Sequence, residues 1–164
     1  MPYNKKRIQA IQKLLDEGKK TIIISWDVWV WKTYLAKSIP HDYFIDEPSY
    51  KLMLSSQSLR LRTPEEWQNS IKLYPLEALS KCATVVYDDF WSAENTSAYI
   101  EKTLFWINKR LDKWLVTIIT TNLWKEKWDK VESRITSRLS ENAVFVNLQW
   151  SDLRKKETLY IAIS

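Results

Sequence analysis

The sequence predicts one α/β domain in three layers, with a mainly parallel five-stranded sheet flanked by helices. Short β-branched and apolar runs, typical of buried strands, alternate along the chain with stretches of helical period. The length of 164 residues also fits one ordinary domain rather than two. We therefore expect a single domain over 1–164, comprising an N-terminal helix (1–18), a nucleotide-binding core (19–156) and a C-terminal tail strand (157–164).

Five runs predict the strands. They carry little alternation of polar and apolar residues, which is typical of parallel strands covered on both faces. Because helical stretches separate them, successive strands are joined by crossovers and run parallel. The predicted strands are 20–25, 43–46, 83–87, 115–121 and 143–148.

Helical periodicity fills the stretches between these strands. An apolar stripe predicts a helix over 4–17, and Gly18 follows it as a C-terminal stop. Residues 47–63 look irregular or only weakly helical. The remaining predicted helices are 32–38, 64–81 with a break at Pro75, 93–113, and a basic stretch over 125–140.

The composition excludes several classes of protein. With 45% hydrophobic and 27% charged residues the chain is typical of soluble globular proteins, and no apolar run approaches the ~20 residues of a membrane span. The N-terminal residues lead into no apolar signal region, so we expect a cytoplasmic protein. A lone cysteine, Cys82, excludes an internal disulfide. The net charge of +5 permits a polyanionic partner without requiring one.

The chain has one glycine and ten tryptophans. A usual glycine content of ~7% predicts about 11 glycines here, which equals the sum of those two counts. We hypothesise that many tryptophans stand where UGA codons are read as glycine. Trp67, Trp106 and Trp128 lie within helical patterns and are candidates for genuine tryptophan. The other seven lie in predicted turns, where glycine's positive φ is useful: Trp26, Trp29, Trp31, Trp91, Trp114, Trp124 and Trp150.

Residues 26–33 carry the motif with the clearest chemistry. They read W-D-V-W-V-W-K-T, which becomes G-D-V-G-V-G-K-T if the three tryptophans are glycines. That is a phosphate-binding loop between a strand and a helix. Its backbone N–H groups must turn inward around the phosphates, where a Cβ would block them. The predicted ATP-binding residues are Trp26, Asp27, Val28, Trp29, Val30, Trp31, Lys32 and Thr33. The alternative is an ordinary strand–turn–helix with a capping threonine.

Two further strand ends supply candidate catalytic residues. The apolar strand before Asp88 and Asp89 fits a Walker B element, in which Asp88 and Thr33 hold Mg²⁺ and Asp89 polarises the attacking water. Asn122 ends the next strand and is placed to bond a γ-phosphate or the water. The alternatives are a solvated Asp-Asp turn and a helix-capping asparagine.

Arg134 and Arg138 are four residues apart and share a helical face. An exposed guanidinium there could reach the γ-phosphate of a neighbouring subunit. The alternative is a solvated basic face.

These motifs, with S-R-L at 137–139 and Q-W-S-D-L-R at 149–154, resemble AAA+ ATPases of the DnaC/IstB type over roughly residues 4–156. These are replicative-helicase loaders and transposition helper ATPases. The resemblance implies that Lys32, Thr33 and Asp88 bind ATP–Mg²⁺. It assigns four further roles, with Asp89 as hydrolytic acid, Asn122 as sensor 1, Arg138 as trans-acting finger and Arg154 as a sensor-2-like arginine. Aspartate stands at 89 where many AAA+ proteins have glutamate.

The resemblance also implies a function. It indicates an ATP-hydrolysing homo-oligomer that acts on DNA, single-stranded and nonspecifically, or on a replicative helicase or transposase. The basic clusters 5–7, 19–20 and 154–156 are candidates for contact with the phosphate backbone. The alternatives are a non-hydrolysing ATP-binding adaptor and a tryptophan-rich module that stacks glycans or single strands. A small P-loop kinase is disfavoured by the T-T-N strand end and the S-R-L segment.

Overall fold

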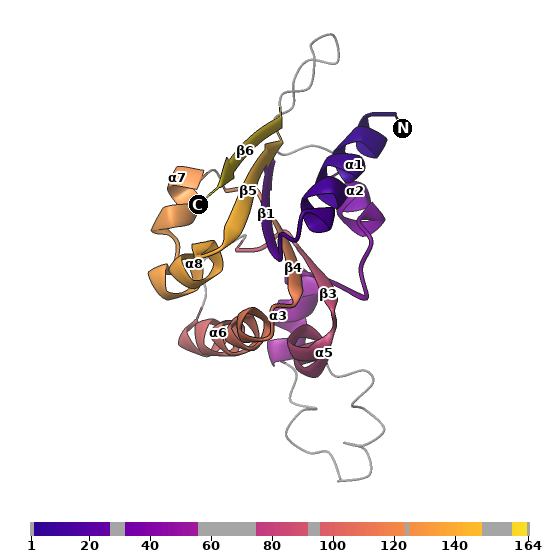
Figure 1. Ribbon diagram of the computed structural model, residues 1–164. Helices are drawn as coiled ribbons and strands as arrows, with labels where there is room; N and C mark the ends of the chain where they lie inside the picture. Colours follow the sequence, from indigo (N-terminus) through magenta and orange to yellow (C-terminus); the bar gives the residue numbers. More distant parts are fainter. Residues whose placement is uncertain are drawn as a thin grey trace.

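Six strands form one sheet in the order β2-β3-β4-β1-β5-β6 (Figure 1). The computed structural model describes residues 2–26, 32–55, 75–91, 96–123, 125–148 and 159–163. Strands β1 to β5 are all parallel, which confirms the predicted fold class, and β6 adds an antiparallel edge strand beside β5. The bounds are β1 Thr21–Trp26, β2 Tyr43–Asp46, β3 Thr84–Asp88, β4 Val116–Thr121, β5 Ala143–Leu148 and β6 Leu159–Ile163.

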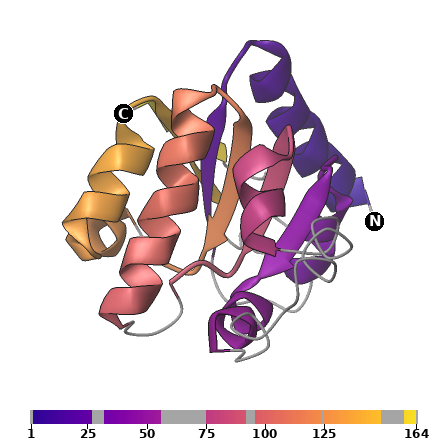
Figure 2. The same ribbon diagram turned by 90° about the horizontal axis from the view of Figure 1, so that it is seen from below.

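Helices cover both faces of the sheet. Figure 2 shows α5, α6 and α8 side by side over one face, where their apolar side chains meet the strands in the larger core cluster together with α3 and α7. Helices α1 and α2 pack on the other face in a second cluster. The bounds are α1 Pro2–Asp16, α2 Lys32–Ser38, α3 Glu47–Ser55, α5 Pro75–Lys81, α6 Ser97–Asp112, α7 Lys125–Lys130 and α8 Ser133–Ser140.

Strand periodicity decides which side chain joins which cluster. Ile23, Tyr87 and Ile119 point toward α6, whereas their neighbours Ile22 and Ile118 point toward α1 and α2. All five are at most 1% exposed. Both faces of the central strands are therefore apolar, which explains their continuous hydrophobic runs. In the described part of the chain, no helix is long and apolar enough to cross a membrane.

Helix boundaries differ from the predictions in three places. Residues 47–55, predicted as irregular or only weakly helical, form a regular helix, because Asp46 Oδ1 accepts the N–H of Ser49 at 2.8 Å and caps α3. Helix α6 begins at Ser97 rather than at residue 93, because Thr96 caps it through the N–H of Tyr99. The basic stretch 125–140 is two helices with a break at 131–132. Predicted helical residues 64–74 lie outside the described residues.

Arg110 joins α6 to three other segments from a fully buried position. Its Nη1 donates to the carbonyls of Leu79 and Cys82 at 2.8 and 2.7 Å, and its Nη2 to that of Val116 at 2.6 Å. Its Nε donates to Thr117 Oγ1 at 2.9 Å. Burial lowers the pKa of Arg110 to about 10. The guanidinium thus ties α6 to α5 and to the amino-terminal ends of β3 and β4.

Candidate active site

The carboxyl ends of β3, β4 and β1 lie next to one another in the sheet. Thr33, in the first turn of α2, lies close to Asp88, the last residue of β3, although 55 positions separate them in the sequence. The Thr33 hydroxyl donates to Asp88 Oδ2 at 3.2 Å, and Asp88 is 2% exposed. The structure therefore brings together the two side chains predicted to hold Mg²⁺.

Asp89 and Asn122 also meet at this edge of the sheet. Asn122 Nδ2 donates to Asp89 Oδ1 at 3.0 Å. The backbone of Asp89 lies in the left-handed region with φ of 61°, which aspartate tolerates better than most residues. The predicted hydrolytic acid and sensor residue thus lie beside the Thr33–Asp88 pair.

Thr120 belongs to the T-T-N strand end but was assigned no role from the sequence, and its side chain contacts both acidic residues. Its hydroxyl donates to Asp88 Oδ1 at 2.6 Å and accepts the Asp89 N–H at 2.9 Å. Its carbonyl accepts the N–H of Phe90 at 2.8 Å. The only sequence signal is its place two residues before Asn122 at the polar end of a buried strand.

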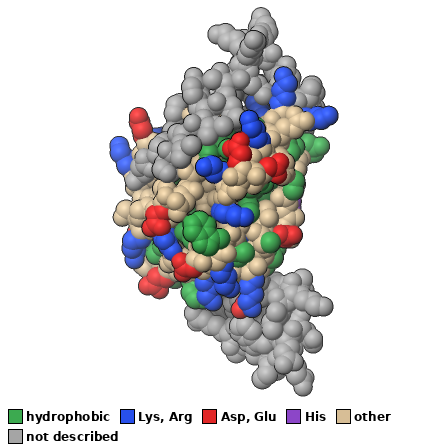
Figure 3. Space-filling view, in the orientation of Figure 1, with side chains coloured by type: hydrophobic (Ala, Val, Ile, Leu, Met, Phe, Trp, Pro, Cys, Tyr) green, Lys and Arg blue, Asp and Glu red, His purple; other side chains and the backbone are tan. Residues whose placement is uncertain are grey.

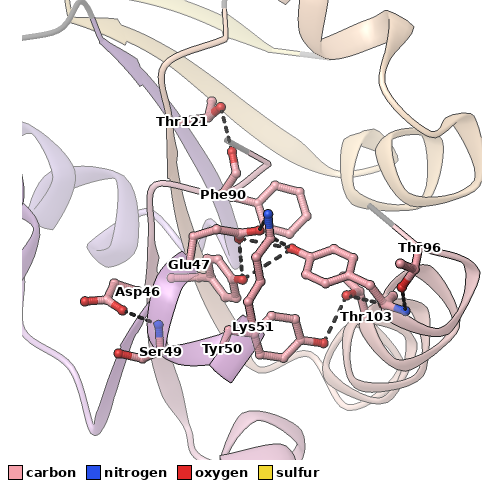
Figure 4. A network of polar contacts seen from close by, with 11 residues as sticks. Asp46, Glu47, Ser49, Tyr50, Lys51, Phe90, Thr96, Thr103 and Thr121 are labelled. Carbon is pink, nitrogen blue, oxygen red and sulfur yellow. Dashed lines mark hydrogen bonds and ion pairs between the residues drawn. The ribbon is translucent and has the colours of Figure 1, made fainter. Parts of the chain in front are cut away.

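A buried polar network lies on the face of the sheet that α6 covers and contacts β3 (Figure 4). Tyr87, directly before Asp88, donates its hydroxyl to Glu47 Oε2 at 2.5 Å, and Tyr99 donates to Glu47 Oε1 at 2.7 Å. Lys51 Nζ lies 3.6 Å from Glu47 Oε1. Burial raises the pKa of Tyr87 and of Tyr99, so both hydroxyls stay protonated donors. The network therefore joins α3, β3 and α6 at Tyr87, the residue before Asp88.

Several predicted ligands fall outside this description. Trp26 ends β1, where it pairs in register with Leu148, and Lys32 opens α2, but the side chains of Trp26 and Lys32 are not described. Residues 27–31, which contain the predicted ligands Asp27, Val28, Trp29, Val30 and Trp31, lie outside the described residues, as does Arg154.

Arg138 lies at the opposite edge of the sheet. It lines a cavity of about 260 Å³ that also includes Thr21, the first residue of β1. Thr21 is at the start of β1, whereas Asp88 and Asn122 lie at the carboxyl ends of β3 and β4. The Arg138 guanidinium is bound to Asp112 and Glu141, each at 2.6 Å. Within one chain, the structure therefore does not bring Arg138 to the other predicted catalytic residues.

Two tryptophans adopt backbone conformations that favour glycine. Trp91 and Trp114 have φ of 61° and 55°. After α6, the N–H groups of Trp114 and Leu115 donate to the carbonyls of Leu111 and Arg110, at 3.2 and 3.0 Å. After α1, the same pair of bonds forms around Gly18, whose φ is 88°. Position 114 is thus a Schellman C′ position, where glycine is the usual residue.

Trp106 and Trp128 are instead fully buried core residues. The indole of Trp106 stacks on Tyr87 with centroids 5.8 Å apart, and its Nε1 donates to the Tyr50 hydroxyl at 3.1 Å. The indole of Trp128 packs against Phe90 with centroids 5.6 Å apart. Trp67 lies outside the described residues.

No protein-family model and no curated protein matches the chain. Solved structures match its fold. DnaI gives a TM-score of 0.62 at 18% identity, covering 88% of this chain and 84% of DnaI. AMPPCP-bound DnaA from Aquifex aeolicus gives 0.62 at 17% identity, covering 88% of this chain and 46% of that one. The DnaC helicase loader gives 0.50 at 22% identity, covering 82% and 79%.

The chain shares the fold of these structures. At these identities the similarity establishes architecture rather than activity. The match covers most of the DnaI structure but under half of the DnaA structure.

Proposed function

We propose that this chain is an ATPase that binds and hydrolyses ATP when residues 26, 29 and 31 are glycine. The contact between Thr33 and Asp88 carries the proposal, with the Asn122–Asp89 pair beside it. These four side chains come from three elements that meet at the carboxyl edge of a parallel sheet, where ligands of such folds bind. Lys32 and the loop motif at 26–33 supply the expected phosphate contacts.

Mg²⁺ fits the oxygen atoms gathered here. A buried carboxylate and a hydroxyl are ligands of the kind that this cation prefers, and Thr33 Oγ1 already faces Asp88 Oδ2. When bound, the ion neutralises charge on the β- and γ-phosphates. Thr33 and Asp88 would hold it, and Lys32 would bind the terminal phosphates.

Asp89 and Asn122 act on the water. The Asp89 carboxylate accepts a proton of the attacking water and so orients the oxygen toward the γ-phosphorus. Asn122 positions that carboxylate through its Nδ2–H, and its amide would sense the γ-phosphate. The products are ADP and inorganic phosphate.

Arg138 serves a neighbouring subunit in this proposal. It lies where the parallel strands begin, bound to Asp112 and Glu141, whereas its own Thr33–Asp88 pair lies where they end. In a homo-oligomer the same edge can face the next subunit's nucleotide. Contact with phosphate then replaces its bonds to Asp112 and Glu141.

The partners we propose are DNA and a replicative helicase or transposase, in the cytoplasm. The likeness in fold to DnaI and to the DnaC helicase loader supports a role in replication, and a DnaA structure with a similar fold holds single-stranded DNA. Lys5 and Lys6 are exposed on α1, whereas Arg7 is buried. On the face of the molecule that Figure 3 shows, basic and acidic side chains are intermixed. DNA binding therefore rests on the likeness more than on a basic patch.

An ATP hydrolysis assay tests the proposal. The chain carrying Trp26→Gly, Trp29→Gly and Trp31→Gly should release phosphate from ATP with Mg²⁺. Adding Asp89→Asn should retain ATP binding and lose most of the hydrolysis. ATP binding without hydrolysis by the glycine-substituted chain would favour the adaptor instead.

The stacking-module alternative gains no support among the described tryptophans. Trp106 and Trp128 are fully buried, and the two at positive φ lie at different turns. Indoles that bind glycans or bases would instead share an exposed face.

A further inference from the structure

The Thr120 side chain lies between the two aspartates and has no exposed surface. A hydroxyl has one proton to donate and lone pairs that accept. The proton points to Asp88 Oδ1 at 2.6 Å, and a lone pair receives the Asp89 N–H at 2.9 Å. One oxygen atom therefore contacts the carboxylate of one acidic residue and the backbone of the other.

We infer that Thr120 is a positioning residue for Mg²⁺ and the attacking water, acting through Asp88 and Asp89. The inference rests on the proposed function. The 2.6 Å bond fixes the rotation of the Asp88 carboxylate, so that Oδ2 faces Thr33. The bond from the Asp89 N–H supports the left-handed backbone at that residue, which directs the carboxylate toward Asn122.

Replacing the Thr120 hydroxyl with a methyl group, as in valine, removes two hydrogen bonds. Valine fills the same volume but offers no donor to Asp88, so Oδ1 of the carboxylate loses its 2.6 Å bond. It also offers no acceptor to the Asp89 N–H, and a backbone donor in such a place is costly when unpaired. Serine keeps the hydroxyl and loses only a methyl group.

The experiment compares Thr120→Val with Thr120→Ser in the chain carrying the three loop glycines. Thr117→Val is the matched control, because Thr117 is also a buried threonine of β4 but bonds Arg110 at the other end of the strand. The first measurement is the free Mg²⁺ concentration that gives half-maximal ATP binding. The second is hydrogen exchange at the Asp89 amide in nucleotide-free protein.

We expect Thr120→Val to raise the Mg²⁺ requirement about tenfold, the lower end of the effect of removing a residue that orients a metal ligand. It should also speed exchange at the Asp89 amide by at least about tenfold and lower kcat more than it raises KM for ATP. Thr120→Ser should restore most of each value. Thr117→Val should lower the melting temperature without changing the Mg²⁺ requirement.

Two other outcomes are distinguishable. If the parent chain binds Mg–ATP and Thr120→Val leaves the Mg²⁺ requirement and the Asp89 exchange unchanged, the positioning role is wrong and the proposed function stands. A rise of equal size in the Mg²⁺ requirement of Thr117→Val would also overturn the positioning role, because the effect would then follow from general destabilisation. If the parent chain itself binds no Mg–ATP, the proposed function fails and this role falls with it.

Discussion

At the scale of single residues, backbone conformation separates two groups of tryptophans. A non-glycine residue in the left-handed region costs roughly 1–2 kcal/mol, because its Cβ approaches the following carbonyl oxygen. Trp114 has this conformation while its side chain is 64% exposed, so little packing offsets the cost. Trp106 has helical backbone, a stacked partner and a hydrogen-bonded indole. Position 114 thus favours glycine, and position 106 favours tryptophan.

Trp114→Gly should raise the free energy of unfolding by about 1 kcal/mol, since it removes the strain and loses little buried surface. Trp106→Gly should lower it by about 4 kcal/mol or more, through a large cavity and a glycine inside a helix. Urea unfolding of both variants, monitored by circular dichroism, measures the two changes. Destabilisation by Trp114→Gly would contradict the assignment of glycine to position 114.

The codons give a second test at this scale. Positions 26, 29, 31 and 114 should be encoded by UGA and position 106 by UGG. Sequencing the gene shows which codon stands at each position. UGG at positions 26, 29 and 31 would remove the basis for a phosphate-binding loop.

At the scale of elements, Arg110 illustrates what the sequence could not reveal. It lies in the predicted helix 93–113 among other basic residues, and nothing local distinguishes it from Lys109, which is exposed. Its burial depends on four carbonyls and a hydroxyl that come from three other segments. Such a site exists only once α5, β3 and β4 are in place.

Arg110→Met should lower the free energy of unfolding by about 3 kcal/mol or more, because several buried carbonyl oxygens lose their donor. Lys102→Met is the matched control, since Lys102 is exposed on the same helix and its loss should change stability by no more than about 0.5 kcal/mol. Chemical denaturation compares the two. Equal effects would show that Arg110 does not hold these segments together.

The buried tyrosines predict loss of stability at alkaline pH. Burial raises the pKa of Tyr50 to about 12, above its ordinary value of 10. The folded chain therefore keeps a proton that the unfolded chain loses, so the contribution is full below pH 10 and is lost as the pH rises through 12. Two pKa units correspond to about 3 kcal/mol. Arg110, with its lowered pKa, acts in the opposite direction over the same range.

Tyr50→Phe isolates the tyrosine effect, because Arg110 is common to both chains. The difference in unfolding free energy between the parent and Tyr50→Phe should shrink as the pH rises above 10. Denaturation at a series of alkaline pH values measures it. A difference that stays constant with pH would contradict the raised pKa of Tyr50.

At the scale of the whole molecule, the sheet separates the two halves of the proposed site. Thr33, Asp88 and Asn122 lie at the carboxyl edge, and Arg138 lies at the other. Under the proposed function, complete catalysis needs two copies, so activity should depend on protein concentration.

Mixing two inactive variants tests this in the chain with the loop glycines. Lys32→Ala should bind no nucleotide but keep its finger, whereas Arg138→Ala should bind ATP but offer no finger to a neighbour. Each alone should hydrolyse little ATP, and the mixture should recover part of the parent activity. Activity in Arg138→Ala equal to that of the parent would contradict a trans-acting role.

The sequence predicted the five parallel strands, because buried strands leave a local signal, and the polar residues at their ends indicated which side chains would meet at Asp88. It missed the cap that makes α3 helical, and it assigned no role to Thr120. The role of Thr120 depends on which strand lies beside β3. Sheet neighbours are set by tertiary packing, so a threonine at a strand end carries no signal of its own.

Equilibrium binding of ATP with Mg²⁺, measured on the chain as printed and on the chain with Trp26→Gly, Trp29→Gly and Trp31→Gly, tests the central claim most directly. We predict binding by the glycine-substituted chain and very weak or no binding by the printed chain, because three indoles would occupy the space that the phosphates need. Tight binding by both chains, or by neither, would contradict the account.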